Sequence, residues 1–128
     1  MGDPSVLGQI GWADLTVPDA APVRDFYEQV TGWSTSPVDM GGYQDYCMIP
    51  SGSEQPVSGI CHARGGNAGL PPVWLIYITV ADLDESIRRC QELGGKLILP
   101  PKAMGNARYC VIQDTVGASV GLYEAAKA

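Results

Sequence analysis

The run Trp12-Ala-Asp-Leu-Thr-Val-Pro-Asp19 sets the interpretation of this chain, because its second half returns later in the sequence. Thr16-Val-Pro-Asp19 is matched by Thr79-Val-Ala-Asp82, an offset of 63 positions (79 − 16). Further matches at this offset are Gly32 with Gly95, and Tyr46-Cys-Met-Ile49 with Tyr109-Cys-Val-Ile112. Repetition at one fixed offset indicates two copies of one structural unit.

Each copy begins with a strand-like segment and continues into an amphipathic helix. Apolar and β-branched residues fill positions 10–17 and 73–80, which favours strands. Asp82, followed by Glu85, resembles a capping box, whereas Asp19 is a poorer helix cap. Apolar residues then recur with helical spacing, at Val23, Phe26, Tyr27 and Val30 in the first copy and at Leu83, Ile87 and Cys90 in the second.

Short strand-like runs separated by turns follow each helix, which ends at Gly32 or at Gly94-Gly95. These runs are 33–38, 43–49 and 57–63 in the first copy, and 96–99, 107–113 and 119–123 in the second. The pattern predicts one α+β domain over residues 1–128. Module one covers about 8–63, a linker about 64–72 and module two about 73–125.

Composition limits the partners that the chain can have. The 128 residues carry a net charge of −6 without a run of Lys or Arg, which argues against nucleic acid. No stretch reaches the roughly 20 apolar residues that span a bilayer, and the first residues lack the pattern of a signal peptide. We therefore expect a cytoplasmic protein without membrane contact. Its cysteines should be free thiols: Cys47, Cys61, Cys90 and Cys110.

These residues resemble the vicinal oxygen chelate superfamily, which contains glyoxalase I, bleomycin resistance proteins and extradiol dioxygenases. The similarity is carried by 12–19, Phe26-Tyr27 and Gly32-Trp33 in the first copy, and by 80–83, 93–95, Asp114-Thr-Val-Gly117 and Leu122-Tyr-Glu124 in the second. The resemblance implies two βαβββ modules that form a curved mixed-sheet cup with the helices outside. It also implies a homodimer, because family chains of this length commonly pair.

In metal-dependent members of the superfamily, the first and last strands of each module supply the metal ligands. The corresponding positions here hold Trp12 and Leu75 on the first strands, and Gly59 and Gly121 on the last. None of these residues has a ligand atom in its side chain, and a single histidine, His62, cannot form a two-histidine site. We therefore expect no metal and no other cofactor, and we expect His62 to be a surface or interface residue.

Strand alternation predicts which residues line the cup. Ala13, Leu15 and Val17 form the more apolar face of the first strand and should pack on the helix, leaving Trp12, Asp14 and Thr16 to face the cup. The same alternation predicts further lining residues, namely Leu75, Tyr77, Thr79, Ser119, Gly121 and Tyr123. The faces of Tyr46, Arg108 and Tyr109 are not assigned by the sequence.

The sequence favours a metal-free protein that binds an apolar or aromatic small molecule, in the manner of bleomycin resistance proteins. Aromatic side chains offer apolar contact area, and Gly59 and Gly121 would leave room for a ligand. The alternative is an enzyme of the superfamily, either a metal-dependent lyase, isomerase or dioxygenase, or an acid–base catalyst that uses Asp14 and a tyrosine.

Two structural interpretations stand beside these functions. The aromatic residues of the predicted lining could pack only between sheets or at a dimer interface, in a module that mediates protein contacts. Asp14 could hold the structure together through backbone hydrogen bonds or through Arg108 rather than act in catalysis.

Overall fold

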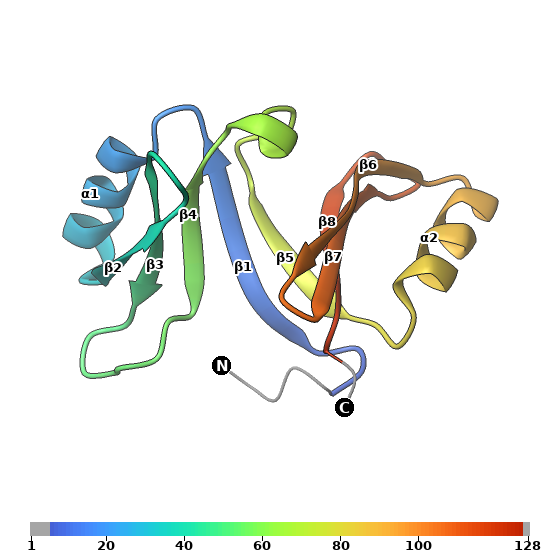
Figure 1. Ribbon diagram of the computed structural model, residues 1–128, viewed down its shortest axis with the longest axis horizontal. Helices are drawn as coiled ribbons and strands as arrows, with labels where there is room; N and C mark the ends of the chain where they lie inside the picture. Colours follow the sequence, from blue (N-terminus) through green and yellow to red (C-terminus); the bar gives the residue numbers. More distant parts are fainter. Residues whose placement is uncertain (1–5, 127–128) are drawn as a thin grey trace. The chain divides into compact units, whose positions relative to one another are not determined.

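A computed structural model describes residues 6–126, which divide into two compact units (Figure 1). The first unit covers 13–74. The second covers 75–126 together with 6–12, whose backbone is tied to Thr79 by hydrogen bonds from Gly8 N to Thr79 O (2.8 Å) and from Thr79 N to Gln9 O (2.9 Å). None of the helices in the described part of the chain is long and apolar enough to cross a membrane.

Each module has the order strand, helix and three strands. The first comprises β1 (Ile10–Val17), α1 (Ala20–Thr31), β2 (Ser34–Asp39), β3 (Gln44–Ile49) and β4 (Ser58–His62), followed by the short helix η1 (Gly65–Asn67). The second comprises β5 (Trp74–Thr79), α2 (Leu83–Glu92), β6 (Lys96–Met104), β7 (Ala107–Gln113) and β8 (Ser119–Glu124).

Strand pairing repeats between the modules. In the first, β2, β3 and β4 are successively antiparallel, and β1 pairs with β4 in parallel. In the second, β6, β7 and β8 are successively antiparallel, and β5 pairs with β8 in parallel. The α+β class and the two βαβββ modules predicted from the sequence are therefore confirmed.

The core of each module lies between its helix and one face of its strands. In the first module Leu15 and Val17 pack with Ile60, Met48 and Tyr46, against α1 residues that include Val23 and Tyr27. In the second, Leu83, Cys110 and Leu122 form the centre, with Ile78, Ile87, Leu97 and Ile112 around them. The opposite face of each set of strands is called here the helix-free face.

The two helices differ in how they begin and in what they expose. Asp82 caps α2 through a hydrogen bond from Glu85 N (3.2 Å), whereas Asp19 makes no side-chain cap at α1. Both outcomes agree with the prediction from the sequence. Phe26 and Val30 of α1 are 57% and 64% exposed, so their expected place on the buried face is wrong.

Strand register shows that the sequence match between Tyr46-Cys47 and Tyr109-Cys110 does not align equivalent positions of the two modules. Gly59 of β4 lies opposite Cys47, whereas the corresponding Gly121 of β8 lies opposite Val111 rather than Cys110. Because a shift of one residue reverses every side chain of a strand, Tyr46 packs in the core while Tyr109 lies on the helix-free face. The match of Tyr46-Cys47 with Tyr109-Cys110 is therefore not a structural equivalence.

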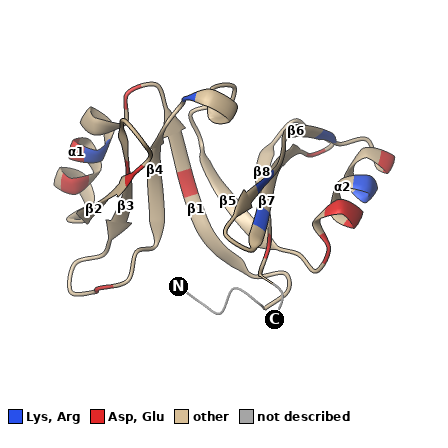
Figure 2. Ribbon diagram, viewed as in Figure 1, with Lys and Arg blue, Asp and Glu red and all other residues tan. Residues whose placement is uncertain are grey.

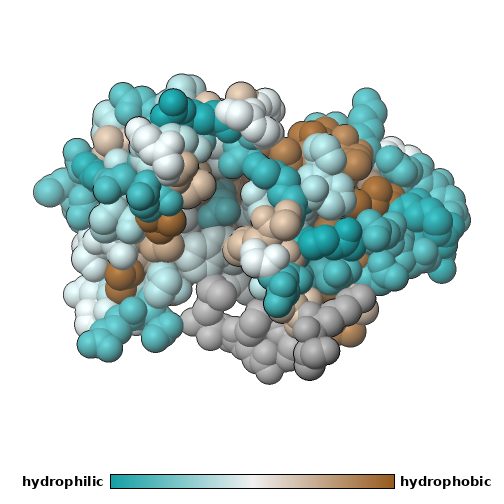
Figure 3. All heavy atoms as spheres, in the orientation of Figure 1, coloured by the Kyte–Doolittle hydropathy of each residue, from teal (hydrophilic) through white to brown (hydrophobic). Residues whose placement is uncertain are grey.

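Charged and apolar residues are unevenly spread over the surface. Figure 2 shows acidic and basic residues together on α2. Figure 3 shows separate brown, apolar groups in a surface that is mostly teal and white. The exposed apolar side chains include Phe26, Val30 and Leu93.

Candidate functional site

A glycine of the last strand allows a side chain of the first strand to lie across the sheet in module one. The β1–β4 register places Asp14 opposite Gly59 on the helix-free face. A Cβ atom at Gly59 would collide with a carboxylate oxygen of Asp14. The half-buried Asp14 side chain therefore lies over the bare backbone of β4, where any larger residue would displace it.

Module two repeats this arrangement with an aromatic ring. Tyr77 lies opposite Gly121, and a Cβ atom at Gly121 would collide with three carbons of the Tyr77 ring. Tyr77 is only 7% exposed, and its ring centroid lies 6.0 Å from that of Tyr109 in an edge-to-face contact. The sequence predicted that Gly59 and Gly121 would leave space for a ligand. This prediction is wrong, because the side chains of Asp14 and Tyr77 occupy that space.

The four positions at which the resemblance places metal ligands do not fit a metal ion in this chain. Trp12 and Leu75 carry no side-chain ligand atom suited to it, and Leu75 has no exposed surface. The space above the two glycines is filled by Asp14 and Tyr77. Within residues 6–126, no group of three or more His, Cys, Asp or Glu side chains is placed to hold a metal ion.

Two thiols share the helix-free face with Asp14. Cys47 lies opposite Gly59, and Cys61 lies two residues further along β4. Burial, and then the negative charge of Asp14, raise the pKa of both thiols above their ordinary value. Both side chains stay protonated at neutral pH, so neither is an activated nucleophile.

The residues predicted to line the cup differ in how much surface they offer. Thr16 (4%), Leu75 (0%) and Tyr77 (7%) are almost fully buried, and Gly121 is buried as well. Trp12, Asp14 and Tyr123 are half-buried. Each of these three side chains therefore keeps part of its surface accessible within its own unit.

Strand pairing adds two residues that sequence reasoning did not place in the site. Tyr109 lies directly opposite Tyr123, and Lys102 lies opposite Tyr109. Lys102 was missed because β6 was expected to end at 99, whereas it continues through Pro100 and Pro101 to Met104. The two prolines are the only local signal, since they mark an irregular edge strand.

Two ionisable residues singled out by the sequence have structural partners. The His62 amide donates to Asp45 Oδ1 (2.8 Å), and its Nδ1 lies 3.4 Å from the same oxygen. Arg108 pairs with Asp84 (3.1 Å) and Glu124 (3.4 Å) in module two rather than with Asp14. The four cysteines are free thiols.

The sequence matches the family model described as the Glyoxalase/Bleomycin resistance protein/Dioxygenase superfamily over residues 9–122. The chain belongs to this superfamily.

Two curated relatives have informative names. The putative glyoxylase CFP32 of Mycobacterium tuberculosis (strain CDC 1551 / Oshkosh) is 33% identical over 121 residues, covering 92% of this chain and 46% of the relative. The anthracycline biosynthesis protein DnrV of Streptomyces peucetius is 27% identical over 128 residues, covering 91% and 46%. The chain thus spans about half the length of these two relatives.

Solved structures share the fold at low sequence identity. Methylmalonyl-CoA epimerase from Mycobacterium tuberculosis aligns with a TM-score of 0.59 and 19% identity, over 99% of this chain and 94% of that one. The hypothetical protein BH1468 from Bacillus halodurans C-125 aligns with a TM-score of 0.61 and 16% identity, over 94% and 96%. These similarities support the superfamily fold alone.

Proposed function

We propose that this superfamily member is a metal-free binding protein for an apolar or aromatic small molecule. The observation that carries the proposal is the filling of the chelating positions. Two hold Trp12 and Leu75, and the glycines at the other two are covered by Asp14 and Tyr77. An ion there would lack the three or four ligands that protein sites provide.

The aromatic character of the ligand is supported by the half-buried side chains of the helix-free faces. Trp12, Tyr109 and Tyr123 keep part of their surface accessible, and aromatic rings contribute large apolar contact areas and stacking. The name of the relative DnrV refers to anthracycline biosynthesis, and anthracyclines contain a planar fused-ring core. A planar polycyclic molecule is therefore the ligand class that we propose.

The experiment is a titration with anthraquinone-2-carboxamide, a neutral planar probe, monitored by tryptophan fluorescence in buffer containing EDTA. We expect saturable binding that is the same with and without EDTA. Trp12→Leu should weaken binding about fivefold or more, because it removes aromatic contact area. Leu93→Ala at the end of α2 is the control, because that side chain is 72% exposed and lies outside the aromatic set, and it should leave the affinity unchanged.

Three results would contradict the proposal. They are no saturable binding, binding that disappears with EDTA, and stoichiometric Ni, Zn, Mn or Fe in the purified protein by elemental analysis. Near-ultraviolet circular dichroism of the Trp12→Leu variant shows whether its folding is intact. Trp12→Phe, which keeps an aromatic ring, should retain most of the affinity.

A second candidate function is an acid–base enzyme that uses Asp14 with a tyrosine. It is favoured by the half-buried position of the Asp14 carboxylate on the helix-free face. In that case Asp14→Asn should abolish turnover while leaving the binding of a neutral ligand intact. The binding protein that we favour should also keep its ligand affinity in the Asp14→Asn variant. It differs from the enzyme in showing no turnover either in the parent protein or in the variant.

We also propose that the protein acts as a homodimer. The outer face of α1 supports this, because Phe26 and Val30 are one helical turn apart and both are more than half exposed. The double variant Phe26→Gln with Val30→Gln should then be monomeric by light scattering, while the same change at the charged outer face of α2, Arg88→Gln, should have no effect. A monomeric parent protein would contradict the proposal.

A further inference from the structure

Strand β6 contains two register shifts that decide which of its side chains lie on the helix-free face. Leu97 is opposite Ile112, and both pack toward α2. Leu99 is opposite Val111, which lies on the other face beside Gly121. A regular strand would keep Leu97 and Leu99 on one face, so the first shift has turned Leu99 to the helix-free face.

The second shift passes through Pro100 and Pro101 and turns Lys102 in the same way. Continued regularly from Leu99, the ladder would place Lys102 opposite Arg108, beside a like charge on the α2 side. The shift places Lys102 opposite Tyr109 instead, and Ala103 opposite Arg108. Irregularities of this kind often re-aim a side chain at a functional site.

Lys102 thereby stands at the end of a row of aromatic residues. The row runs across β6, β7 and β8 as Lys102, Tyr109 and Tyr123, and it ends at Thr79 of β5. Lys102, Tyr109 and Tyr123 are all half-buried, so each keeps some accessible surface. An ammonium group and two phenol rings are therefore available side by side on one face of module two.

Lys102 differs from most of the arginines in its charge partners. The guanidinium groups that form ion pairs with carboxylates are those of Arg24, Arg88, Arg89 and Arg108, and Arg64 lies over the ring of Tyr43. None of the ion pairs within residues 6–126 involves Lys102, although the chain has a net charge of −6. Lys96 of the same strand likewise takes part in none of these ion pairs, but it is exposed, whereas Lys102 is half-buried.

We infer that Lys102, Tyr109 and Tyr123 bind a planar aromatic carboxylate, with its rings on the two phenols and its anionic group on the Lys102 ammonium. This inference rests on the proposed function and narrows it, because it specifies the charge of the aromatic ligand. The ligand's carboxylate supplies the counter-charge that no ion pair within residues 6–126 gives Lys102. A hydrogen bond between two charged groups is stronger than one between neutral groups, so the anion should be preferred over a neutral isostere.

The experiment compares anthraquinone-2-carboxylate with anthraquinone-2-carboxamide by isothermal titration calorimetry. We expect the parent protein to bind the carboxylate about tenfold more tightly than the amide. Lys102→Met should bind the two probes equally, whereas Lys102→Arg should keep the preference. Lys96→Met, on the same strand but exposed, is the matched control and should also keep it.

The outcomes separate this inference from the proposed function. If the amide and the carboxylate bind the parent protein equally, or if Lys102→Met keeps the preference, the inference is wrong and the aromatic-binding function stands. If neither probe binds, both are wrong. The preference should also shrink when the salt concentration is raised from 50 mM to 500 mM, because ions screen a partly exposed charge pair.

Discussion

The two modules share one backbone design but fill the same position with different chemistry. In module one a carboxylate, Asp14, lies over the last-strand glycine, and in module two a phenol ring, Tyr77, does so. The neighbours follow the same division, since Cys47 and Cys61 surround Asp14 whereas Tyr109 contacts Tyr77. One repeated fold therefore provides a polar face in one half and an aromatic face in the other.

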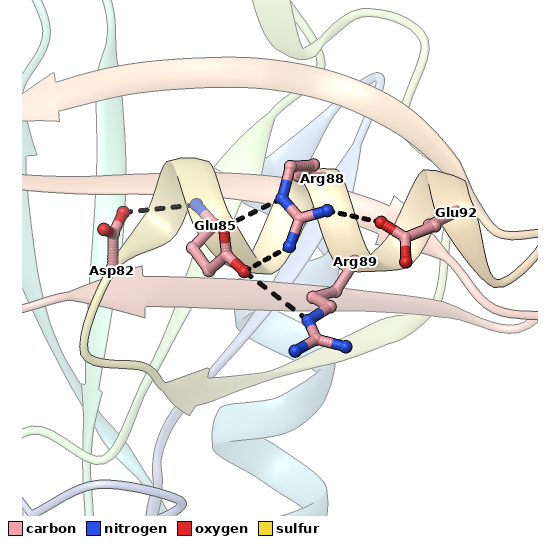
Figure 4. A network of polar contacts seen from close by, with 5 residues as sticks. All are labelled: Asp82, Glu85, Arg88, Arg89 and Glu92. Carbon is pink, nitrogen blue, oxygen red and sulfur yellow. Dashed lines mark hydrogen bonds and ion pairs between the residues drawn. The ribbon is translucent and has the colours of Figure 1, made fainter.

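The helices differ in a parallel way. On α2, Asp82 caps the helix, and Glu85, Arg88, Arg89 and Glu92 form ion pairs on the outer surface (Figure 4). Glu124 adds a second cap by accepting a hydrogen bond from Leu83 N (2.7 Å). The α1 helix has no side-chain cap and exposes Phe26 and Val30. Helix α2 thus presents a charged surface, whereas α1 combines the Arg24–Asp25 ion pair with exposed apolar side chains.

The largest effect that would test this comparison is expected for Gly121→Ala. The new Cβ atom would overlap a ring that is 7% exposed and has little room to move, so we expect a loss of about 3 kcal/mol in the free energy of unfolding. Urea unfolding gives the measurement. Gly69→Ala is the control, because a Cβ atom there meets nothing within 4 Å and the free energy should barely change.

The corresponding change in module one, Gly59→Ala, should have a smaller effect. The colliding atom is the end of the half-buried Asp14 side chain, which can rotate away, so we expect a loss of about 1 kcal/mol. The double variant with Asp14→Ala should recover part of that loss. Urea unfolding of the parent, the two single variants and the double variant gives the coupling free energy between the two positions. A loss as large as that of Gly121→Ala would show that the two positions are equally rigid.

The helix caps should give the smallest difference. Asp82→Ala removes a cap that accepts from Glu85 N, and we expect a loss of about 1 kcal/mol. Asp19→Ala removes no cap hydrogen bond and should change the free energy of unfolding by less than about 0.5 kcal/mol. Thermal and urea unfolding measure both, and equal losses would contradict the contrast between α1 and α2.

Much of the fold could be predicted because its signals are local. The strand-to-helix junctions at Asp19 and Asp82 require only neighbouring residues, and alternation correctly placed Leu15 and Val17 against the helix. The helical spacing of Phe26 and Val30 wrongly predicted that both side chains are buried, and the reason is physical. An apolar residue at a helical interval shows that a stripe exists, but the packing decides how much of that stripe the sheet covers.

The candidate site was only partly predictable. The absence of ligand atoms at Trp12, Leu75 and the two glycines can be read from the chain directly. Which side chains fill the space above Gly59 and Gly121 depends on the residues opposite them, and these come from strands more than 40 positions away in sequence (59 − 14; 121 − 77).

The amino-acid sequence by itself determined the duplication, the order of strands and helices, and the loss of the chelating side chains, because each depends on residue identity and short-range spacing. Only the tertiary structure decided the register. That register placed Tyr46 and Tyr109 on opposite faces and turned Lys102 toward the aromatic row. Hydrogen bonding between strands fixes which residues meet, and a shift of one residue in that pairing exchanges the two faces of a strand without altering its local pattern.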